Sequence, residues 1–479
     1  MGENIDHAGF SKSEFDEFKD RLRRETASLM QSFRDQTLSS RGKSMGLELE
    51  TWLVDDQFSP APDNDRFLQL LNRKEVVPEL SRYNVEINSN PLPIDGTCLS
   101  RAEADLREIW DKITACAAKM NRKMMIIGSL PTLTDDMLGP ASMSDRERYR
   151  ALNQQIIRQR KEKPVHVLIE GEDTLDLVHT DVMLEAATTS MQLHLQAEPE
   201  MMARYYNASL IASSISAAVA ANTPYLFRKS LWSESRIPLF EKSLQLPGFF
   251  DCDGEVIGRV TFGHGYVRQS LLEIFLENLD AYPVLLPVLF DEERERLKHL
   301  HLHNGSIWRW NRPIIETGSD GQPHLRVEHR VPAAGPTLAD TVANAGLFLG
   351  LAHHLAVQEV PPESQLPFQA LRRDFYEAAR HGPDARIHWP GIDGTLTIRE
   401  LLEDGLLRIA AEGLQDLGVE QEEADWYVGK IIGERIKNRR TGSQWQRQWM
   451  ATRNGNFADM TEVYYENQQQ NIPVGQWTL

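Results

Sequence analysis

The stretch Met45-Gly46-Leu47-Glu48-Leu49-Glu50-Thr51-Trp52-Leu53 decides the fold that the sequence predicts. Its residues alternate between apolar and polar, which is the pattern of a half-buried β-strand. Leu47 and Leu49 fall on one face, and Glu48 and Glu50 fall on the other, because successive side chains of a strand point to opposite sides. Two carboxylates placed in this way lie roughly 6–7 Å apart and repel each other. A divalent cation is the usual compensation, and an ordinary solvated strand face is the alternative interpretation.

The same alternation recurs in three later segments, at residues 83–88, 190–196 and 324–331. Their polar faces carry Asn84, Glu86 and Asn88, then Ser190, Gln192, His194 and Gln196, and finally His324, Arg326, Glu328 and Arg330. If the four strands join one sheet, one side forms a core and the other side collects acids, an imidazole and guanidinium groups. These groups suit metal ions together with a phosphate group that is being transferred.

Composition excludes several classes of protein. The chain has 479 residues, of which 41% are hydrophobic and 25% are charged, as in soluble globular proteins. No stretch approaches the roughly 18 uninterrupted apolar residues of a spanning helix, and the first residues do not form an export signal. The net charge of −18 argues against nucleic acid as the main partner. Cys98, Cys116 and Cys252 are too scattered for a disulfide framework or a structural zinc site. We therefore expect a cytoplasmic protein with neither a nucleic-acid nor a membrane partner.

Helical patterns separate and follow the predicted strands. We expect helices at 11–35 with Ser13 as the cap, from a capping box at Ser100-Arg101-Ala102-Glu103 to about Met120, and at 145–161, 198–221, 337–357, 364–380, 397–417 and 420–440. Met124–Leu130 is expected to be a buried strand, residues 225–270 an irregular active-site loop region, and the end of the chain a looser tail. The one-sided amphipathicity of the strands argues for an antiparallel sheet with helices on one face. The predicted fold class is therefore α+β.

Eight motifs resemble those of the glutamate–cysteine ligase superfamily, in its bacterial carboxylate–amine ligase branch. They are Gly46-Leu47-Glu48-Leu49-Glu50, Val85-Glu86-Ile87-Asn88-Ser89, Gly128-Ser129-Leu130-Pro131, Arg148-Tyr149, Gln192-Leu193-His194-Leu195-Gln196, Ala221-Asn222-Thr223-Pro224, Arg326-Val327-Glu328-His329-Arg330 and Arg380-His381-Gly382-Pro383-Asp384-Ala385. The last departs from the family pattern by placing Pro383 at a leucine position. Each motif is weak alone, and their number and order make the resemblance specific.

The resemblance implies a glutamine-synthetase-like fold, in which a curved, mostly antiparallel sheet binds ATP, two or more Mg²⁺ ions and substrates on a polar concave face. It implies that ATP phosphorylates a carboxylate, classically the γ-carboxylate of glutamate, and that an amine then displaces the phosphate. The partners are then a small-molecule carboxylate and amine, and a homodimer is possible. We expect residues 1–40 to form a helical lead and residues 41–479 a single ligase catalytic domain that includes a helical part at 364–479.

Roles follow for individual residues, because phosphoryl transfer needs hard cations and fixed positive charge more than covalent chemistry. The metal ligands are expected to be Glu48, Glu50, Glu86, His194 and Glu328; the catalytic residues Arg330, Arg309 and Arg312; and the substrate or nucleotide ligands Gln192, Gln196, Arg326 and Asn222. For His194, a hydrogen bond to a phosphate is the alternative to metal ligation. Arg330 is expected to neutralise charge on the γ-phosphate. Arg309 and Arg312 stand among two tryptophans, so cation–π contacts on a surface loop are the alternative for them.

Three other functions remain open at this point: a true glutamate–cysteine ligase, a non-catalytic descendant that binds a nucleotide or an amino acid, and a sheet-based metallohydrolase. The run Lys298-His299-Leu300-His301-Leu302-His303 suggests either a transition-metal strand or the end of a strand or helix with incidental histidines. His353 and His354 lie in an apolar helical pattern and are expected to be structural.

Overall fold

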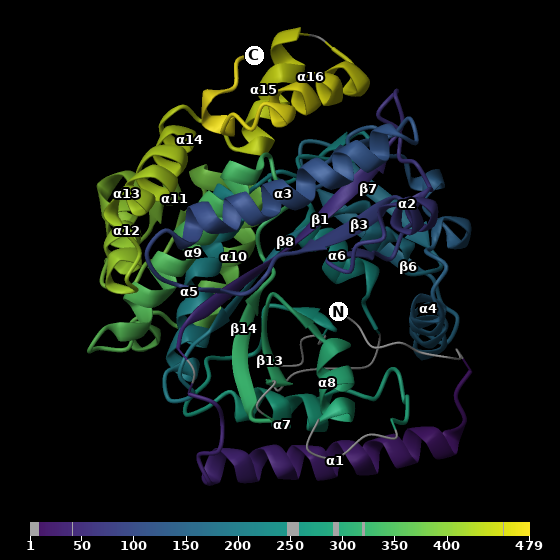
Figure 1. The fold of residues 1–479 in the computed structure, drawn as a ribbon, viewed down its shortest axis with the longest axis vertical. Coiled ribbons are helices and arrows are strands. Elements are labelled where there is room, and N and C mark those ends of the chain that lie inside the picture. The colour runs from purple at the N-terminus through teal and green to yellow at the C-terminus, as the bar shows by residue number, and fades with distance from the viewer. Residues whose placement is uncertain (1–8, 41, 247–257, 291–296, 319–320, 454) are drawn as a thin grey trace.

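The computed structural model describes residues 9–40, 42–246, 258–290, 297–318, 321–453 and 455–479 (Figure 1). Its centre is a curved sheet with the strand order β13–β14–β8–β1–β3–β2, and β4 and β5 also pair with β1. These pairings are antiparallel. The strands of this sheet are β1 (Ser44–Val54), β2 (Val76–Pro78), β3 (Asn84–Asn88), β4 (Leu92–Pro93), β5 (Lys123–Met125), β8 (Met191–Gln196), β13 (Asn311–Thr317) and β14 (Pro323–His329). The four predicted amphipathic strands thus join one sheet.

Helices occupy most of the remaining chain. They are α1 (Lys12–Arg34), α2 (Asn64–Leu71), α3 (Cys98–Ala118), α4 (Glu147–Gln159), α5 (Met202–Val219), α6 (Arg236–Ser243), α7 (Leu272–Ala281), α8 (Lys298–Gly305), α9 (Leu338–Val357), α10 (Phe368–His381), α11 (Ile398–Leu401), α12 (Leu407–Asp416), α13 (Gln421–Ala424), α14 (Gly433–Lys437), α15 (Gly442–Arg453) and α16 (Phe457–Gln469). Short strand pairs lie between them: β6 (Val165–Glu170) with β7 (Thr174–His179), β9 (Tyr225–Leu226) with β10 (Lys229–Ser230), β11 (Val260–Thr261) with β12 (Trp308–Arg309), and β15 (Arg386–Ile387) with β16 (Leu396–Thr397). The predicted α+β class is confirmed.

The sheet has an apolar face and a polar face, and this division positions the site. Leu47 and Leu49 of β1 are buried, whereas Glu48 and Glu50 between and beyond them are partly exposed. Helix α5 packs against β13 and β14, and α9 packs against β8. The helices therefore cover the apolar face and leave the polar face free for chemistry. Within the described ranges, no helix combines the length and apolarity needed to cross a membrane.

Small residues allow two of these helices to approach closely. A methyl group built on Gly350 of α9 would lie 2.0 Å from the carbonyl oxygen of Ala410 in α12. A methyl group built on Gly413 would lie 2.2 Å from the carbonyl oxygen of Gly350. Both distances are far shorter than a van der Waals contact, so the two helices touch backbone to backbone. The small residues of this apolar helix therefore serve helix–helix packing as well as packing on the sheet.

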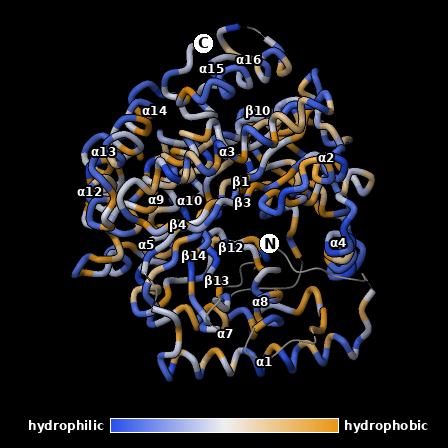
Figure 2. The backbone as a smooth tube through the Cα atoms, viewed as in Figure 1, coloured by the Kyte–Doolittle hydropathy of each residue, from blue (hydrophilic) through white to orange (hydrophobic). Residues whose placement is uncertain are grey.

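The N-terminal helix α1 braces the elements at one end of the sheet. Its residues alternate between hydrophilic and hydrophobic along the helix (Figure 2), and it packs against α7 and α8. Glu25 of α1 accepts the backbone N–H of Leu300 (2.8 Å) and lies 2.6 Å from Nδ1 of His299, both in α8. Because this carboxylate is buried among its partners, it fixes α8 relative to α1.

Two predicted helix starts were wrong by a few residues. Helix α1 is capped by Ser11, whose side chain forms a capping box with Glu14, and not by Ser13. Helix α3 begins at Cys98, so Ser100 lies inside it and its N–H donates to Glu423 instead of forming a capping box. In each case more than one hydroxyl residue stands near the start, and the local pattern cannot select between them.

Other local predictions were wrong for reasons of tertiary packing. The expected strand at Met124–Leu130 is reduced to β5. The expected loose tail forms α15 and α16, which are held by contacts among Trp445, Tyr464 and Trp477. The expected loop region 225–270 contains α6, and Pro238 stands in the first turn of this helix, where proline is tolerated. Residues 247–257 of that region lie outside the described part.

Candidate active site on the polar face of the sheet

The sheet register gathers three of the predicted ligands. His194 of β8 lies opposite Glu328 of β14 on one side and opposite Gly46 of β1 on the other. Nε2 of His194 is 2.9 Å from Oε1 of Glu48 and 3.8 Å from Oε1 of Glu328. One ligand atom from each residue lies within 4.8 Å of the others, and within the described residues this is the group that meets that distance criterion for a metal ion. Two carboxylates and an imidazole thus converge on one point.

Both carboxylates of this group stay ionised. Burial alone would raise the pKa of Glu48, but the charge of His194 and its hydrogen bond outweigh burial and hold that pKa at about 2. Burial would also raise the pKa of Glu328, but the guanidinium groups of Arg312 and Arg330 reverse the effect and hold the pKa below its ordinary value. Ionised oxygens with one imidazole fit a hard divalent cation such as Mg²⁺ or Mn²⁺.

Two arginines fix Glu328 in place. Arg312 of β13 binds it in a fork, with Nε 2.7 Å from Oε2 and Nη2 2.8 Å from Oε1. Arg330 donates to Oε2 of the same carboxylate at 3.1 Å and also to the side chain of Gln192. Both arginines line a cavity that lies over the polar face of the sheet. They therefore place fixed positive charge beside the convergent group.

Glu50, a further predicted ligand, is held by the protein itself. It accepts the N–H (2.6 Å) and the hydroxyl (2.9 Å) of Ser190, and the amide of Gln192 (3.1 Å). Burial raises its pKa despite the opposing charge of Arg330. Glu50 lines the cavity one step along β1 from Glu48, outside the group of three.

Glu86 of β3 is the other predicted ligand outside that group. It lines the same cavity and accepts the amide of Asn88 at 2.9 Å. Burial, followed by repulsion from Glu48 and Glu79, raises its pKa well above the ordinary value. The expected set of five ligands is therefore divided between a tight group of three and an acidic region beside it.

Two acids of this region were missed in the sequence. Burial and the charges of Glu50 and Glu185 raise the pKa of Glu79 to about 8, and burial and the charge of Glu50 raise that of Glu185 to about 8. Tyr149 and Arg148 line the cavity beside them. Glu79 directly follows β2, and Glu185 lies within the 3₁₀ turn Met183–Ala187; both elements are short and show no periodicity. The available signal was an acid flanked by apolar residues on both sides.

The cavity above this face has a volume of about 390 Å³ and has polar and apolar walls. Gln192 and Arg326 line it as expected, and Arg326 pairs with Glu316 at 2.8 Å. Gln196 faces Arg326 across the sheet register but is outside the lining residues. The histidine run forms helix α8, so it is not a metal-binding strand. His301 of this helix lines the cavity.

Two predicted site residues lie away from the cavity. Arg309 is 2% exposed and donates to Glu277 and Asn278, each at 2.9 Å. It belongs to β12, which pairs with β11 and not with β13, and this turns its side chain towards α7. Asn222 donates to the carbonyl oxygen of Ala334 (2.7 Å) and to the hydroxyl of Tyr464 (2.8 Å) in the core. The structure does not bring either residue to the group of three.

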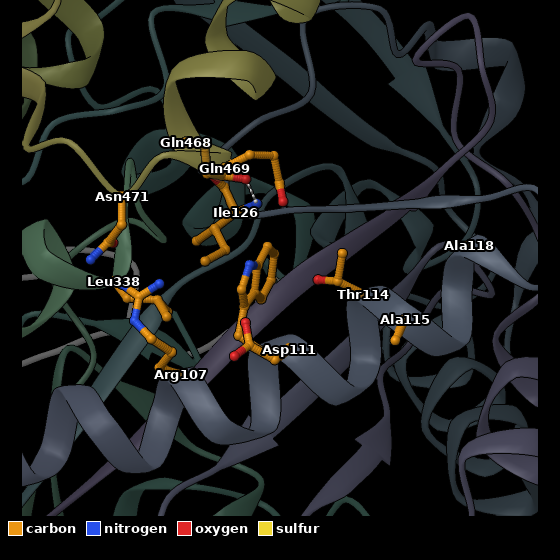
Figure 3. A pocket seen from close by; sticks show the side chains of 11 residues that line it. Arg107, Asp111, Thr114, Ala115, Ala118, Ile126, Leu338, Gln468, Gln469 and Asn471 are labelled. Atoms are coloured by element: carbon orange, nitrogen blue, oxygen red, sulfur yellow. Dashed lines mark hydrogen bonds between the residues drawn. The ribbon is translucent and has the colours of Figure 1, made fainter.

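A second cavity, of about 300 Å³, lies between α3 and the C-terminal segment (Figure 3). Arg107, Asp111 and Thr114 line it from α3, and Gln468 and Asn471 line it from the other side. The side chain of Gln468 accepts the N–H of Ile126 at 3.0 Å, which ties the last helix to the sheet. This cavity shares no lining residue with the cavity over the polar face.

Comparison with known proteins connects this site to a family. A model of glutamate–cysteine ligase family 2 matches residues 44–470. The glutamate–cysteine ligase of Francisella tularensis in complex with AMP has a similar fold, with a TM-score of 0.52, 10% identity, and coverage of 92% of this chain and 89% of that chain. A bifunctional glutathione synthetase from Pasteurella multocida aligns with a TM-score of 0.49 and 11% identity over 95% of this chain and 55% of that chain. None of the curated proteins compared with the chain matches it.

Substitution of Glu48 tests the metal group. Glu48→Gln replaces an ionised oxygen ligand by a neutral amide of the same shape, so we expect the affinity for Mn²⁺, a probe that takes the same ligands as Mg²⁺, to fall at least tenfold. The free Mn²⁺ signal in electron paramagnetic resonance measures this affinity. Glu200→Gln, at an exposed glutamate, is the matched control. Equal affinity in both variants would contradict the assignment.

The raised pKa values of Glu79 and Glu185 predict a pH dependence of stability. A carboxyl group with a folded pKa of about 8 contributes stability that is complete below the unfolded value of 4.5 and is lost as the pH rises through 8. Glu48 and Glu328 have lowered pKa values and stay ionised over this window. The free energy of unfolding of the metal-free protein should therefore fall between pH 5 and pH 9.

The variant Glu185→Gln should flatten this decline by roughly 4 kcal/mol, because the amide has no proton to lose and each pH unit between pH 5 and the folded pKa is worth about 1.4 kcal/mol. Denaturant unfolding in the presence of a chelator at pH 5, 7 and 9 measures the effect, with Glu200→Gln as the control. Parallel curves for wild type and Glu185→Gln would show that Glu185 ionises normally in the folded protein.

Proposed function

The chain belongs to glutamate–cysteine ligase family 2, and from this membership we propose that it is an ATP- and Mg²⁺-dependent ligase that joins a carboxylate to an amine. The observation that carries the proposal is the convergence of Glu48, His194 and Glu328 beside Arg312 and Arg330. A descendant that only binds ligands has no need of a carboxylate buried between two arginines at such a point.

The proposed reaction has two steps. An oxygen of the donor carboxylate attacks the γ-phosphorus of ATP, the bond to the bridging oxygen breaks, and ADP leaves with that electron pair. The nitrogen of the amine then attacks the acyl carbon, and the C–O bond to phosphate breaks. Phosphate leaves with the electron pair of that C–O bond, and the nitrogen of the new amide loses a proton. Glutamate or a similar amino acid is the proposed donor.

The residues of the site would contribute binding and charge. Glu48, His194 and Glu328 would hold Mg²⁺, which when bound neutralises and orients phosphate oxygens. Arg330 directly follows β14 and lies beside Glu328. There its guanidinium group can meet the charge that develops on the transferring phosphoryl group. Arg312 keeps the carboxylate of Glu328 ionised and in one orientation. Transfer then depends on preformed charge, with no covalent intermediate on the protein.

A true glutamate–cysteine ligase is the second candidate, because it belongs to the same family and would use the same polar face of the sheet. The difference concerns only the acceptor. A thiol-bearing acceptor would be identified by preferential turnover of cysteine over other amines.

Release of ADP from purified protein tests the proposal. The protein is incubated with ATP, Mg²⁺ and a matrix of amino-acid donors and amine acceptors, including cysteine and ammonium. We expect ADP release to require both a donor and an acceptor, and the product to have the mass of their condensation. The absence of ADP release over the whole matrix, although MgATP binds by calorimetry, would favour a protein that only binds nucleotide.

The variant Arg330→Ala belongs in the same assay. Because the charge that Arg330 meets develops in the transition state, its loss should lower kcat by a factor of about 10² to 10³ and change KM much less. Arg408→Ala is the matched control, since Arg408 has an exposed side chain in α12 and pairs with Glu412. An effect on KM alone would contradict the role of Arg330.

A further inference from the structure

The floor of the cavity has two ends that differ in charge. Along the sheet, the group of three lies between Glu50 and Arg330 at one end and Gln196 and Arg326 at the other. Beyond Glu50 stand Glu79 and Glu185, which interact electrostatically with it. We call the part of the cavity that Glu50, Glu79 and Glu185 share the acidic end. The guanidinium groups of Arg148 and Arg330 partly offset the charges of these carboxyl groups.

Helix α6 packs on the 3₁₀ turn that carries Glu185, so an apolar wall borders the acidic end. Its members line the cavity: Leu152 on α4, Val182 just before the turn, Phe240 on α6, Leu244 just after α6, and Leu286 after α7. Four of them are 9% exposed or less, and Leu152 is partly exposed. The aromatic ring of Phe240 lies 6.5 Å from that of Trp308, which also lines the cavity. Several apolar side chains from separate elements thus face one space.

Hydrogen bonds behind the wall hold its parts together. The N–H of Val182 donates to Oδ1 of Asn153 at 3.2 Å, which places the 3₁₀ turn against Leu152 on α4. Arg160, at the end of α4, donates to the carbonyl oxygens of Ser243 and Gln245, on either side of Leu244. The wall is therefore fixed in place by the backbone and is not formed by mobile surface side chains.

Taken with the proposed function, on which this inference rests, the geometry points to a primary amine with an apolar hydrocarbon group as the acceptor substrate. We propose that its ammonium group enters against Glu79 and Glu185, and that its hydrocarbon group packs on Leu152, Phe240 and Leu244. An acceptor amine is a cation before it loses a proton, and a cation that enters beside these carboxyl groups offsets their mutual repulsion and lets them ionise and pair with it. An acceptor that carries its own carboxylate, as cysteine does, would add to that repulsion.

The step itself is that of the proposed ligase. The amine loses a proton, its nitrogen forms the C–N bond to the acyl carbon, and phosphate leaves with the electron pair of the C–O bond. The apolar wall takes no part in this chemistry. Its contribution is to select the acceptor, because hydrocarbon removed from water favours binding in proportion to its buried area.

A homologous series of acceptors tests the inference. The full chain is assayed with MgATP, the donor found in the ADP-release matrix, and the acceptors ammonium, methylamine, propylamine, pentylamine and phenethylamine, with ethanolamine and cysteine as polar comparisons. We expect kcat/KM to rise about fourfold for each added methylene until the wall is covered. A flat or falling series, or a preference for cysteine or ethanolamine, would overturn the inference.

Two variants locate the effect. Leu152→Gln should lower kcat/KM for pentylamine at least tenfold while the values for ammonium, and the KM of ATP, stay within about twofold. Leu70→Gln is the matched control, because Leu70 on α2 is 57% exposed and lies outside the cavity lining. Equal losses for ammonium and pentylamine in Leu152→Gln would show a general structural defect and would contradict selection by the wall.

The two proposals fail in different ways. Turnover of cysteine or ammonium without any dependence on chain length would leave the ligase standing and overturn the apolar acceptor. An absence of turnover with every acceptor, under conditions in which MgATP binds, would overturn both.

Discussion

The site depends on one constraint, the ionised carboxylate of Glu328. This residue is buried, with 1% of its surface exposed. A buried charge is tolerated only when it is paired and hydrogen-bonded, and the fork of Arg312 with the additional bond from Arg330 meets this requirement. The pairing needs β13 and β14 in one register, and β14 must in turn place Glu328 opposite His194 on β8. A slip by one residue would send all of these side chains to the apolar face. The charge balance and the sheet register therefore support each other.

The sequence revealed the floor of the site more fully than its walls. Alternation over five or more residues located β1, β3, β8 and β14, because a strand with one buried face must place its polar residues on the other. Arg309 and Arg312 looked alike in the sequence because they stand three residues apart in the same tryptophan-rich segment. They separate in the fold because β12 pairs with β11 while β13 joins the central sheet. Strand partners are a tertiary property that local periodicity does not contain.

The acids of the acidic end escaped detection for a related reason. Glu79 follows a short strand and Glu185 lies within a short 3₁₀ turn, neither of which shows a period, and only the chain path brings the two acids to Glu50. Helices α15 and α16 were expected as a looser tail because they are fixed by contacts such as that of Gln468 with Ile126, which connects residues 342 positions apart. What local pattern could predict was the class of the fold and the chemistry of one sheet face. What it could not predict was the enclosure of that face.

The enclosure also explains why the ends of the chain matter to the site. Glu25 of α1 holds His299 and Leu300 of α8, and the neighbouring turns of α8 present His301 and Asn304 to the cavity. A helix distant in sequence thus sets one wall of the cavity, while α4 and α6 set another. The polar face of the sheet supplies the charged groups of the proposed phosphoryl transfer, and these walls bound the space above it.

The transfer of oxygen from the donor carboxylate is the most direct measurement of the central claim, that this floor activates a carboxylate with ATP. A donor labelled with ¹⁸O in its carboxylate is converted to amide, and the phosphorus products are examined by mass spectrometry. Attack of the carboxylate on the γ-phosphorus predicts one ¹⁸O in the released phosphate for each amide formed, and none in ADP. Label in AMP, or unlabelled phosphate accompanied by amide formation, would contradict the account.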